Sequence, residues 1–301
     1  MAARPGGSAR GHIGARSPRL TAARRLTKRA LRQHARAFLV EGPQAVAEAF
    51  ASGAPITELF VTAEARARHE RLVAAVAGTG LPVHAVSGEV MNGLAQTVTP
   101  QGLLAVCGFV DVPLGQVLGA APSGAPVTGS PGGAGGPGTP GPPPSLLAVL
   151  ANVRDPGNAG TVLRTADAAG AAAVIFSDAS VDPYNGKCVR ASAGSLFHLP
   201  VVAGARLDEA ASALRAAGVR ILAADARGGR SLDELSPCEL AAPTAWVIGN
   251  EAWGLPPGLL ALADDRVAVP IYGKAESLNL AAAAAVCLYA SARAQRAQRV
   301  L

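Results

Sequence analysis

The C-terminal half of the chain alternates short apolar runs with helical patterns, and this alternation constrains the fold more than any other feature. The runs expected to form strands are residues 146–151, 172–176, 220–224, 244–248 and 266–269. Helical periodicity is expected over residues 160–169, 208–217 and 280–298. Nearly continuous apolar strands separated by helices are typical of a parallel sheet that is covered on both faces. The sequence therefore predicts an α/β domain whose ligand site lies at the carboxyl ends of the strands.

A second, smaller alternation precedes it. Short strands are expected at residues 38–40, 58–62, 83–86 and 103–110, with helices at 44–52 and 72–77. This pattern predicts a small α/β layer domain. We find no paired His, Cys or carboxylate set in its sequence, which favours binding over chemistry.

Gly, Pro, Ser and Thr dominate residues 119–144, where no charged residue occurs, and such a composition is typical of a linker. A length of 301 residues also exceeds that of one ordinary domain. We therefore expect four regions. They are a basic disordered arm at 1–16, a small domain at 17–111, a linker at 112–144 and a larger domain at 145–301.

The net charge of +6 comes from the N-terminus, because ten of the 27 basic residues precede the first acidic one, Glu41. An arm of this kind suits contact with nucleic-acid phosphates. The alternatives are a solvated tail or a mitochondrial transit peptide, although the basic stretch continues without a cleavage-like break into structured-looking sequence. No apolar run reaches the roughly 18 residues that a membrane span requires. We expect a cytoplasmic protein without a membrane segment.

Four cysteines lie far apart, at positions 107, 188, 238 and 287, and no histidines cluster. Zinc sites and disulfide frameworks depend on closely spaced or regularly patterned cysteines. The sequence therefore predicts neither a metal nor a disulfide.

Polar residues gather in three loops that follow strands of the larger domain. The first, residues 152–167, is expected to turn at Pro156-Gly157 before the helix, and it contains Asn158 and Arg164. Taken alone, Asn158 could be a helix N-cap and Arg164 a surface cation paired with an acid. The loop by itself leaves the structural and the functional interpretation open.

The other two loops are similarly ambiguous when each is considered alone. Residues 249–256 place Glu251 between Gly249 and Gly254, which also suits an ordinary Gly-Pro turn. In residues 269–280, Ser277 and Asn279 could simply cap the long helix that follows. What argues for function is that all three loops carry polar residues beside buried strands.

Together the loops resemble the SpoU (TrmH-type) RNA 2′-O-methyltransferases, the ribose-methylating branch of the SPOUT superfamily. An Asn-x-Gly followed by Arg-Thr-Ala spans residues 158–166, Gly-x-Glu-x-x-Gly-Leu spans 249–255 and Ser-Leu-Asn spans 277–279. Upstream, residues 38–42 and 97–102 resemble the ends of the RNA substrate-binding domain that such enzymes often carry.

The resemblance implies S-adenosylmethionine as methyl donor, no metal, and a parallel-sheet SPOUT domain with a C-terminal trefoil knot. It also implies a homodimer and an RNA substrate, with ribosomal RNA favoured over transfer RNA by the upstream domain. The residues matched to the family's catalytic positions are Asn158, Arg164, Glu251, Ser277 and Asn279. Those matched to its cofactor-binding positions are Gly249, Val269, Ile271 and Leu278.

The resemblance implies that Arg164 acts on the ribose hydroxyl, yet a guanidinium donates hydrogen bonds and accepts none, so it is an improbable base. Our hypothesis is that Arg164 holds a phosphate of the target nucleotide and stabilises the developing oxyanion, while the proton leaves to phosphate or water. Three alternatives stay open. They are a transfer-RNA 2′-O-methyltransferase, a SPOUT enzyme acting on a base, and a non-catalytic RNA-binding or assembly factor.

Overall fold

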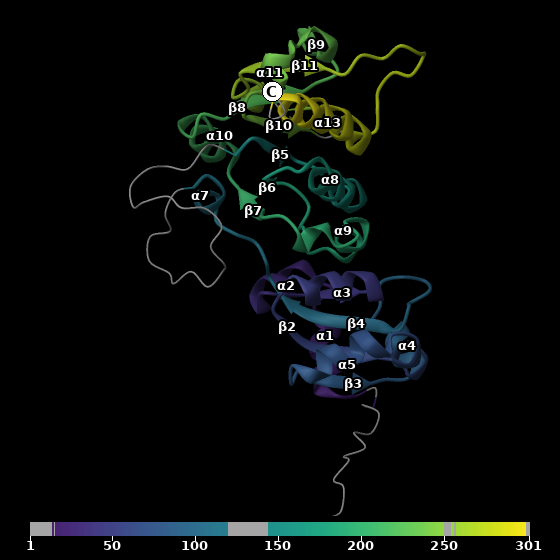
Figure 1. Cartoon of the computed structure of the whole chain (residues 1–301). Coiled ribbons are helices and arrows are strands. Elements are labelled where there is room, and N and C mark those ends of the chain that lie inside the picture. Colours follow the sequence, from purple (N-terminus) through teal and green to yellow (C-terminus); the bar gives the residue numbers. More distant parts are fainter. Residues whose placement is uncertain (1–13, 15, 120–143, 250–253, 256, 299–301) are drawn as a thin grey trace, which may run out of the picture. The chain divides into compact units, whose positions relative to one another are not determined.

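The computed structural model describes residues 14, 16–119, 144–249, 254, 255 and 257–298. The chain divides into two compact units (Figure 1). The N-terminal unit contains Met1–Phe109 together with Tyr184–Arg190, and the C-terminal unit contains Val110–Pro183 and Ala191–Leu301. Each unit has its own sheet.

The N-terminal unit is built on a four-stranded sheet with the order β1-β4-β2-β3. Its strands are β1 (Ala37–Glu41), β2 (Ile56–Val61), β3 (Val83–Ala85) and β4 (Leu103–Gly108). The strands β1 and β2 pair antiparallel with β4, and β3 pairs parallel with β2. Its helices are α1 (Pro18–Arg25), α2 (Arg29–Ala35), α3 (Pro43–Ala51), α4 (Ala63–Arg68), α5 (Glu70–Gly78) and α6 (Gly88–Asn92).

The helices α1 and α2 occupy a basic stretch for which the sequence pattern predicted no element. Leu20 and Ala23 of α1 are fully buried in a core with Phe60 and Leu104 of the sheet. Three residues with apolar side chains, Leu20, Ala23 and Leu26, are enough to bury one side of the helix, while its arginines stay at the surface. The high density of Arg conceals this short apolar stripe in the sequence.

The C-terminal unit contains a seven-stranded, entirely parallel sheet with the order β7-β6-β5-β10-β8-β11-β9. Its strands are β5 (Leu146–Leu150), β6 (Ala173–Ser177), β7 (Val201–Ala205), β8 (Arg220–Ala224), β9 (Arg230–Ser231), β10 (Thr244–Ile248) and β11 (Asp265–Ala268). The predicted α/β class with a parallel sheet is confirmed. The predicted strands shift by at most one residue at either end, whereas β7 and β9 had no counterpart among them.

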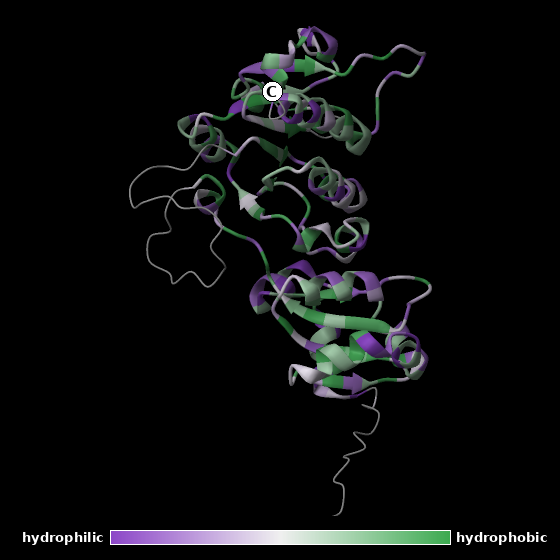
Figure 2. Cartoon of the chain, in the orientation of Figure 1, coloured by the Kyte–Doolittle hydropathy of each residue, from purple (hydrophilic) through white to green (hydrophobic). Residues whose placement is uncertain are grey.

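Helices cover both faces of this sheet. On one face, α8 (Pro156–Ala169) and α13 (Leu280–Gln298) pack against each other and against β5 and β10 (Figure 1). On the other face, α10 (Leu207–Ala216) buries Ala211 and Leu214 in a core with Ile175 and Ile221. The hydropathy colouring shows strongly apolar strands between helices of mixed character (Figure 2). The remaining elements are α7 (Leu114–Val117), α9 (Gly186–Ala191), η1 (Ser195–Phe197), η2 (Leu232–Glu234), α11 (Pro237–Ala241) and α12 (Pro257–Leu260).

Residues 112–118, predicted as the beginning of a linker, are folded. Val112 donates a backbone hydrogen bond to Val201 of β7 at 2.9 Å, and Leu114 and Val117 of α7 pack on the core of the C-terminal unit. Leu and Val side chains in this stretch supply apolar surface that the Gly/Pro-rich composition farther along lacks. The rest of the predicted linker, residues 120–143, and the arm up to residue 13 lie outside the described residues.

The helix α8 begins at Pro156, four residues earlier than predicted. Pro is favoured at the first position of a helix, because its missing N–H would have no intrahelical partner there. Asp155, and not Asn158, is the N-cap, since its Oδ1 accepts a hydrogen bond from the Asn158 N–H at 2.8 Å. Interpreting Pro156-Gly157 as a turn was therefore wrong, and Asn158 lies within the first helical turn. None of the described helices is long and apolar enough to cross a membrane.

Candidate active site at the carboxyl ends of the parallel strands

The loops that follow β5, β8, β10 and β11 emerge at the same edge of the sheet, because all of these strands run parallel. This is the edge at which open α/β sheets bind ligands. The three polar stretches identified in the sequence all begin at these strand ends.

The first stretch is held in place by two buried serines. Ser180 Oγ donates to the Leu150 carbonyl at 2.8 Å and accepts the Val153 N–H at 3.1 Å. Ser177 Oγ accepts the Asn152 N–H at 3.1 Å and lies 2.8 Å from Ser180 Oγ. Asn152 adopts a φ of 57°, a left-handed conformation that costs energy for a residue other than Gly. The serine pair thus fixes the chain between β5 and α8.

Arg164 lies on the exposed side of α8. The surface-cation interpretation requires an acidic partner, yet its side chain makes no ion pair or hydrogen bond with any other residue that the structure describes. On the opposite side of the helix, Val162 and Ala166 are buried. The fold therefore presents the Arg164 guanidinium to solvent from a rigid element.

Asn158 and Asn279, 121 residues apart in sequence, are joined directly. Asn279 Nδ2 donates to Asn158 Oδ1 at 3.2 Å. Asn279 Oδ1 accepts the backbone N–H groups of Ala281 at 2.9 Å and Ala282 at 3.3 Å. Asn279 is therefore the N-cap of α13, as one interpretation of the sequence suggested, and it also connects the first stretch to the third.

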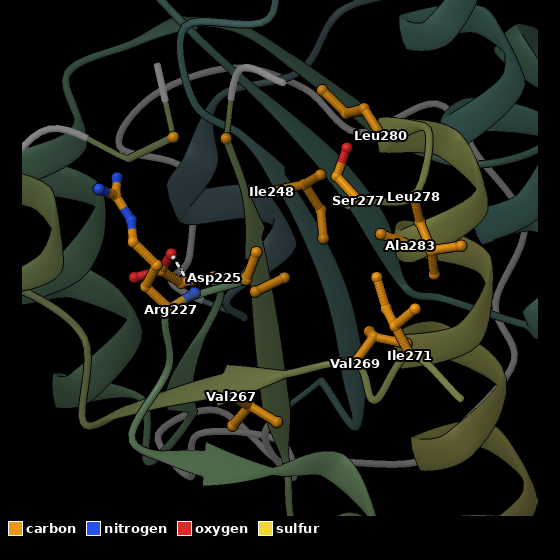
Figure 3. Close-up of a pocket in the computed structure, with 14 residues that line it drawn as sticks. Asp225, Arg227, Ile248, Val267, Val269, Ile271, Ser277, Leu278, Leu280 and Ala283 are labelled. Carbon is orange, nitrogen blue, oxygen red and sulfur yellow. Dashed lines mark hydrogen bonds between the residues drawn. The ribbon is translucent and has the colours of Figure 1, made fainter. Parts of the chain in front are cut away.

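A cavity of about 440 Å³ lies at the carboxyl ends of β8, β10 and β11 (Figure 3). It is lined by Ala224, Asp225, Ala226, Arg227, Ile248, Gly249, Gly254, Val267, Val269, Ile271, Ser277, Leu278, Leu280 and Ala283. Its size and largely apolar lining suit a small organic ligand. The structure brings all four predicted cofactor-binding residues to this one cavity.

Ser277 also lines the cavity, whereas Asn158, Arg164 and Asn279 are not among its described lining residues. The predicted catalytic set is thus divided between the cavity wall and the neighbouring α8–α13 contact. Glu251 lies outside the described residues, together with Asn250, Ala252 and Trp253.

The structure requires both glycines of the second stretch, Gly249 by its packing and Gly254 by its backbone conformation. A Cβ at Gly249 would lie 2.8 Å from Leu255 Cγ, closer than real Cβ contacts allow. Gly254 has a φ of +66°, the left-handed region that favours Gly. The absence of a side chain at Gly249 therefore lets Leu255, at the other end of the stretch, pack directly against the end of β10.

Asp225 and Arg227, in the loop after β8, are cavity residues that the sequence reasoning did not identify. Asp225 Oδ2 accepts hydrogen bonds from Arg266 Nη2 at 2.6 Å and Nε at 3.2 Å, and Oδ1 accepts the Arg227 N–H at 3.1 Å. Burial alone raises the pKa of Asp225, but these hydrogen bonds and the charges of Arg266 and Arg227 together hold it below its usual value. The strand-end rule applied to the other three loops would have found this loop as well.

The chain matches two family models. Residues 145–289 match the SpoU rRNA Methylase family. Residues 17–105 match the MRM3-like substrate binding domain.

Similar proteins share both halves of the chain. It is 32% identical to the 23S rRNA (guanosine(2553)-2′-O)-methyltransferase of Bacillus subtilis, over 84% of this chain and 87% of that protein. It is 30% identical to the 23S rRNA (guanosine-2′-O-)-methyltransferase of Bordetella pertussis, over 79% of this chain and 89% of that one.

Solved structures resemble the whole fold. The AdoMet-bound rRNA methyltransferase from Sinorhizobium meliloti matches with a TM-score of 0.75 and 29% identity, covering 92% of this chain and 95% of that chain. The SpoU methyltransferase AviRb from Streptomyces viridochromogenes, in complex with AdoMet, gives a TM-score of 0.73 at 28% identity, covering 94% and 99%. With its parallel sheet, its three strand-end stretches and these relatives, the chain belongs to the SpoU rRNA methylase family of RNA 2′-O-methyltransferases.

Proposed function

We propose that the protein transfers a methyl group from S-adenosylmethionine to a ribose 2′-hydroxyl of ribosomal RNA. The observation that carries this proposal is the convergence of the three stretches. Asn279 bonds to Asn158, and the loops bearing Gly249 and Leu278 enclose one cavity beside that contact. The relatives named above as 23S rRNA methyltransferases support ribosomal RNA as the substrate class.

The cavity suits the methyl donor. Its side-chain walls from Ile248, Val269, Ile271 and Leu278 are apolar (Figure 3), and Gly249, which has no side chain, also lines it. An adenine ring requires flat apolar contacts and main-chain hydrogen-bonding partners. When bound, S-adenosylmethionine supplies a sulfonium-activated methyl group, so no metal is required for its transfer.

Arg164 is proposed to bind a phosphate of the target nucleotide and to stabilise the 2′-oxygen as it loses its proton. Its guanidinium donates several hydrogen bonds in a fixed plane, which suits phosphate recognition. In the step itself, the 2′-oxygen forms a bond to the methyl carbon while the bond from that carbon to sulfur breaks. The hydroxyl proton leaves to phosphate or water.

Asn158, Glu251, Ser277 and Asn279 are proposed to orient Arg164 and the substrate ribose. Alignment of the hydroxyl with the methyl group supplies much of the rate in reactions of this kind. The contact between Asn158 and Asn279 supports such a role, because it fixes the start of α13 against the start of α8.

Incubation of the full-length protein with labelled S-adenosylmethionine and ribosomal RNA from cells that lack the gene tests the proposal. After digestion to nucleosides, mass spectrometry is expected to show the label on a 2′-O-methylated nucleoside. A methyl group on a base would contradict ribose specificity. Labelling of transfer RNA but not ribosomal RNA in a parallel reaction would overturn the substrate class.

We further propose a homodimer, a trefoil knot at the C-terminus and a cytoplasmic location. The exposed apolar residues Val286 and Tyr289, each 42% exposed and one helical turn apart on α13, support dimerisation. The four regions expected from composition, 1–16, 17–111, 112–144 and 145–301, also stay proposals as functional divisions. In this scheme the first two regions contact RNA.

A further inference from the structure

The walls of the cavity are of two chemical kinds. Most lining side chains are aliphatic, and they gather on one side, around Ile248, Val269 and Leu278 (Figure 3). Among the described lining residues, the only charged side chains are Asp225 and Arg227, on the other side of the view. A ligand that fills this cavity therefore meets an apolar region and a charged edge.

The negative charge of Asp225 is already paired with a positive charge of the protein. Its carboxylate accepts hydrogen bonds from the Arg266 guanidinium and from the Arg227 backbone N–H, and its side chain is 7% exposed. The ion pair also holds the loop, since Arg266 Nη2 reaches the Arg227 carbonyl at 3.4 Å. Asp225 and Arg266 thus act together as an anchor for the backbone of Arg227.

The next residues of the loop are fixed as well. The Gly228 N–H donates to the Asp225 carbonyl at 2.8 Å. A Cβ at Gly228 would lie 2.8 Å from the Ala268 backbone nitrogen, so the loop can follow β11 only because this residue is Gly. Asp225 before Arg227 and Gly228 after it therefore hold the Arg227 backbone in place.

The Arg227 side chain is not anchored in the way that its backbone is. Its guanidinium makes no hydrogen bond or ion pair with any residue in the described part of the chain. It lies beside the second stretch, because a Cβ placed on Gly254 would be 3.7 Å from Arg227 Nη2. A planar cation at the edge of an apolar cavity suits a ligand that combines a flat ring system with a carboxylate.

We propose that Arg227 binds the carboxylate at the amino-acid end of S-adenosylmethionine, and that it determines the preference of the cavity for ligands that carry this group. The inference rests on the proposed function, because it takes the methyl donor to occupy the cavity. The anchored loop lowers the entropy cost of holding the guanidinium in place. Arg227 is thus a ligand-specificity residue, distinct from Arg164 on α8.

The test compares two ligands that differ only in the amino-acid end. S-adenosylhomocysteine and 5′-methylthioadenosine share the adenosine and the thioether, but the second lacks the carboxylate and the amine. Isothermal titration of the full-length wild-type protein is expected to show tighter binding of S-adenosylhomocysteine. In R227A its affinity is expected to fall about tenfold or more, as for loss of a charged hydrogen bond, while 5′-methylthioadenosine binds within about twofold of wild type.

Two further variants complete the design. R227K keeps the charge without the planar fork and is expected to restore only part of the affinity for S-adenosylhomocysteine. R71A removes an exposed arginine from α5 of the N-terminal unit and is expected to leave both affinities unchanged. Circular dichroism verifies the fold of each variant.

The outcomes separate the two proposals. If R227A weakens both ligands by the same factor, Arg227 only supports the loop, and the inference fails. If it weakens neither ligand but lowers RNA affinity, Arg227 contacts phosphate instead, and the inference also fails. If the wild-type protein binds neither ligand, the proposed function fails first.

Discussion

Asn279 Nδ2 donates a hydrogen bond to Asn158 Oδ1 at 3.2 Å, and the same Asn279 side chain caps α13 through its oxygen. One amide therefore has a local task, at the start of a helix, and a long-range task, joining two helices that begin 124 positions apart. The two tasks use different atoms, so substitution can separate them.

The first prediction concerns substitutions that separate the capping oxygen of Asn279 from its donating nitrogen. N279D keeps an oxygen for the cap but removes the Nδ2 donor, so thermal stability should stay close to wild type while methyl transfer falls at least tenfold. N279A should also lose about 1 kcal/mol of stability, because the N-cap is lost. N158A removes the same hydrogen bond from its other partner without removing a helix cap, since Asp155 caps α8. Melting temperature and single-turnover methylation of ribosomal RNA are the measurements, and full activity in N279D would contradict the role of the bond.

The second prediction concerns Arg164. R164K keeps the positive charge but removes the planar fork, so turnover should fall by at least tenfold while S-adenosylhomocysteine affinity stays unchanged. The physical reason is that Arg164 is exposed on α8 and is absent from the described cavity lining. Measured kcat at saturating donor, with titration of the donor product, checks this. Near-normal turnover with an unchanged pH profile would rule out a role that needs the guanidinium plane.

The third prediction concerns Ser180, which is 2% exposed and bonds to Leu150 and Val153. S180A leaves the Val153 N–H without its partner in the core, so the free energy of unfolding should fall by about 1–3 kcal/mol. S212A removes an exposed hydroxyl on α10 that bonds only to the preceding turn, and it should change stability by less than about 0.5 kcal/mol. Urea denaturation compares the two variants. Equal stability of S180A and S212A would show that the serine pair does not hold the first stretch.

The fourth prediction is a loss of stability in acid that depends on Glu239. Arg230 donates to Glu239 Oε1 at 2.8 Å and to Asp265 Oδ2 at 2.9 Å. The Arg230 hydrogen bond, followed by those from Ser236, lowers the pKa of Glu239 from 4.5 to about 2. A depressed folded-state pKa means that the contribution is complete above pH 4.5 and disappears as the pH falls towards about 2.

E239Q isolates this charge, because Gln also serves at the third position of the Ser236 capping box. The wild-type protein should be more stable than E239Q above pH 4.5, and the difference should shrink steadily as the pH is lowered to about 2. Urea midpoints measured across this range provide the comparison. A difference that is independent of pH would show that the carboxylate charge is not responsible.

The fifth prediction concerns the exposed apolar residues of α13. If Val286 and Tyr289 form part of a dimer interface, V286E should convert a dimer into a monomer, because burying an unpaired carboxylate is costly. A297E places the same charge at an exposed position farther along the helix and should leave the dimer intact. Light scattering after size-exclusion chromatography gives the mass. A monomeric wild-type protein would contradict the proposed homodimer.

The sequence pattern alone predicted the elements whose apolar residues follow one another along the chain. The strands β8 and β10 were predicted at residues 220–224 and 244–248, as the structure has them, because a strand covered on both faces is a nearly continuous apolar run. The predicted start of α8 was wrong, since Pro156-Gly157 fits both a turn and a helix start, and only the Asp155 cap distinguishes them. The two-residue strand β9 is too short to produce any period.

The sequence by itself determined that three polar stretches follow buried parallel strands, and with them the family resemblance. Tertiary structure alone decided that Asn279 meets Asn158, that Gly249, Val269, Ile271 and Leu278 share one cavity, and that Asp225 and Arg266 anchor the loop of Arg227. The physical reason is that a periodic pattern reports only the neighbours of a residue along the chain. Strand order and helix packing, which bring distant loops to one edge, depend on burying the apolar surface of the whole sheet at once.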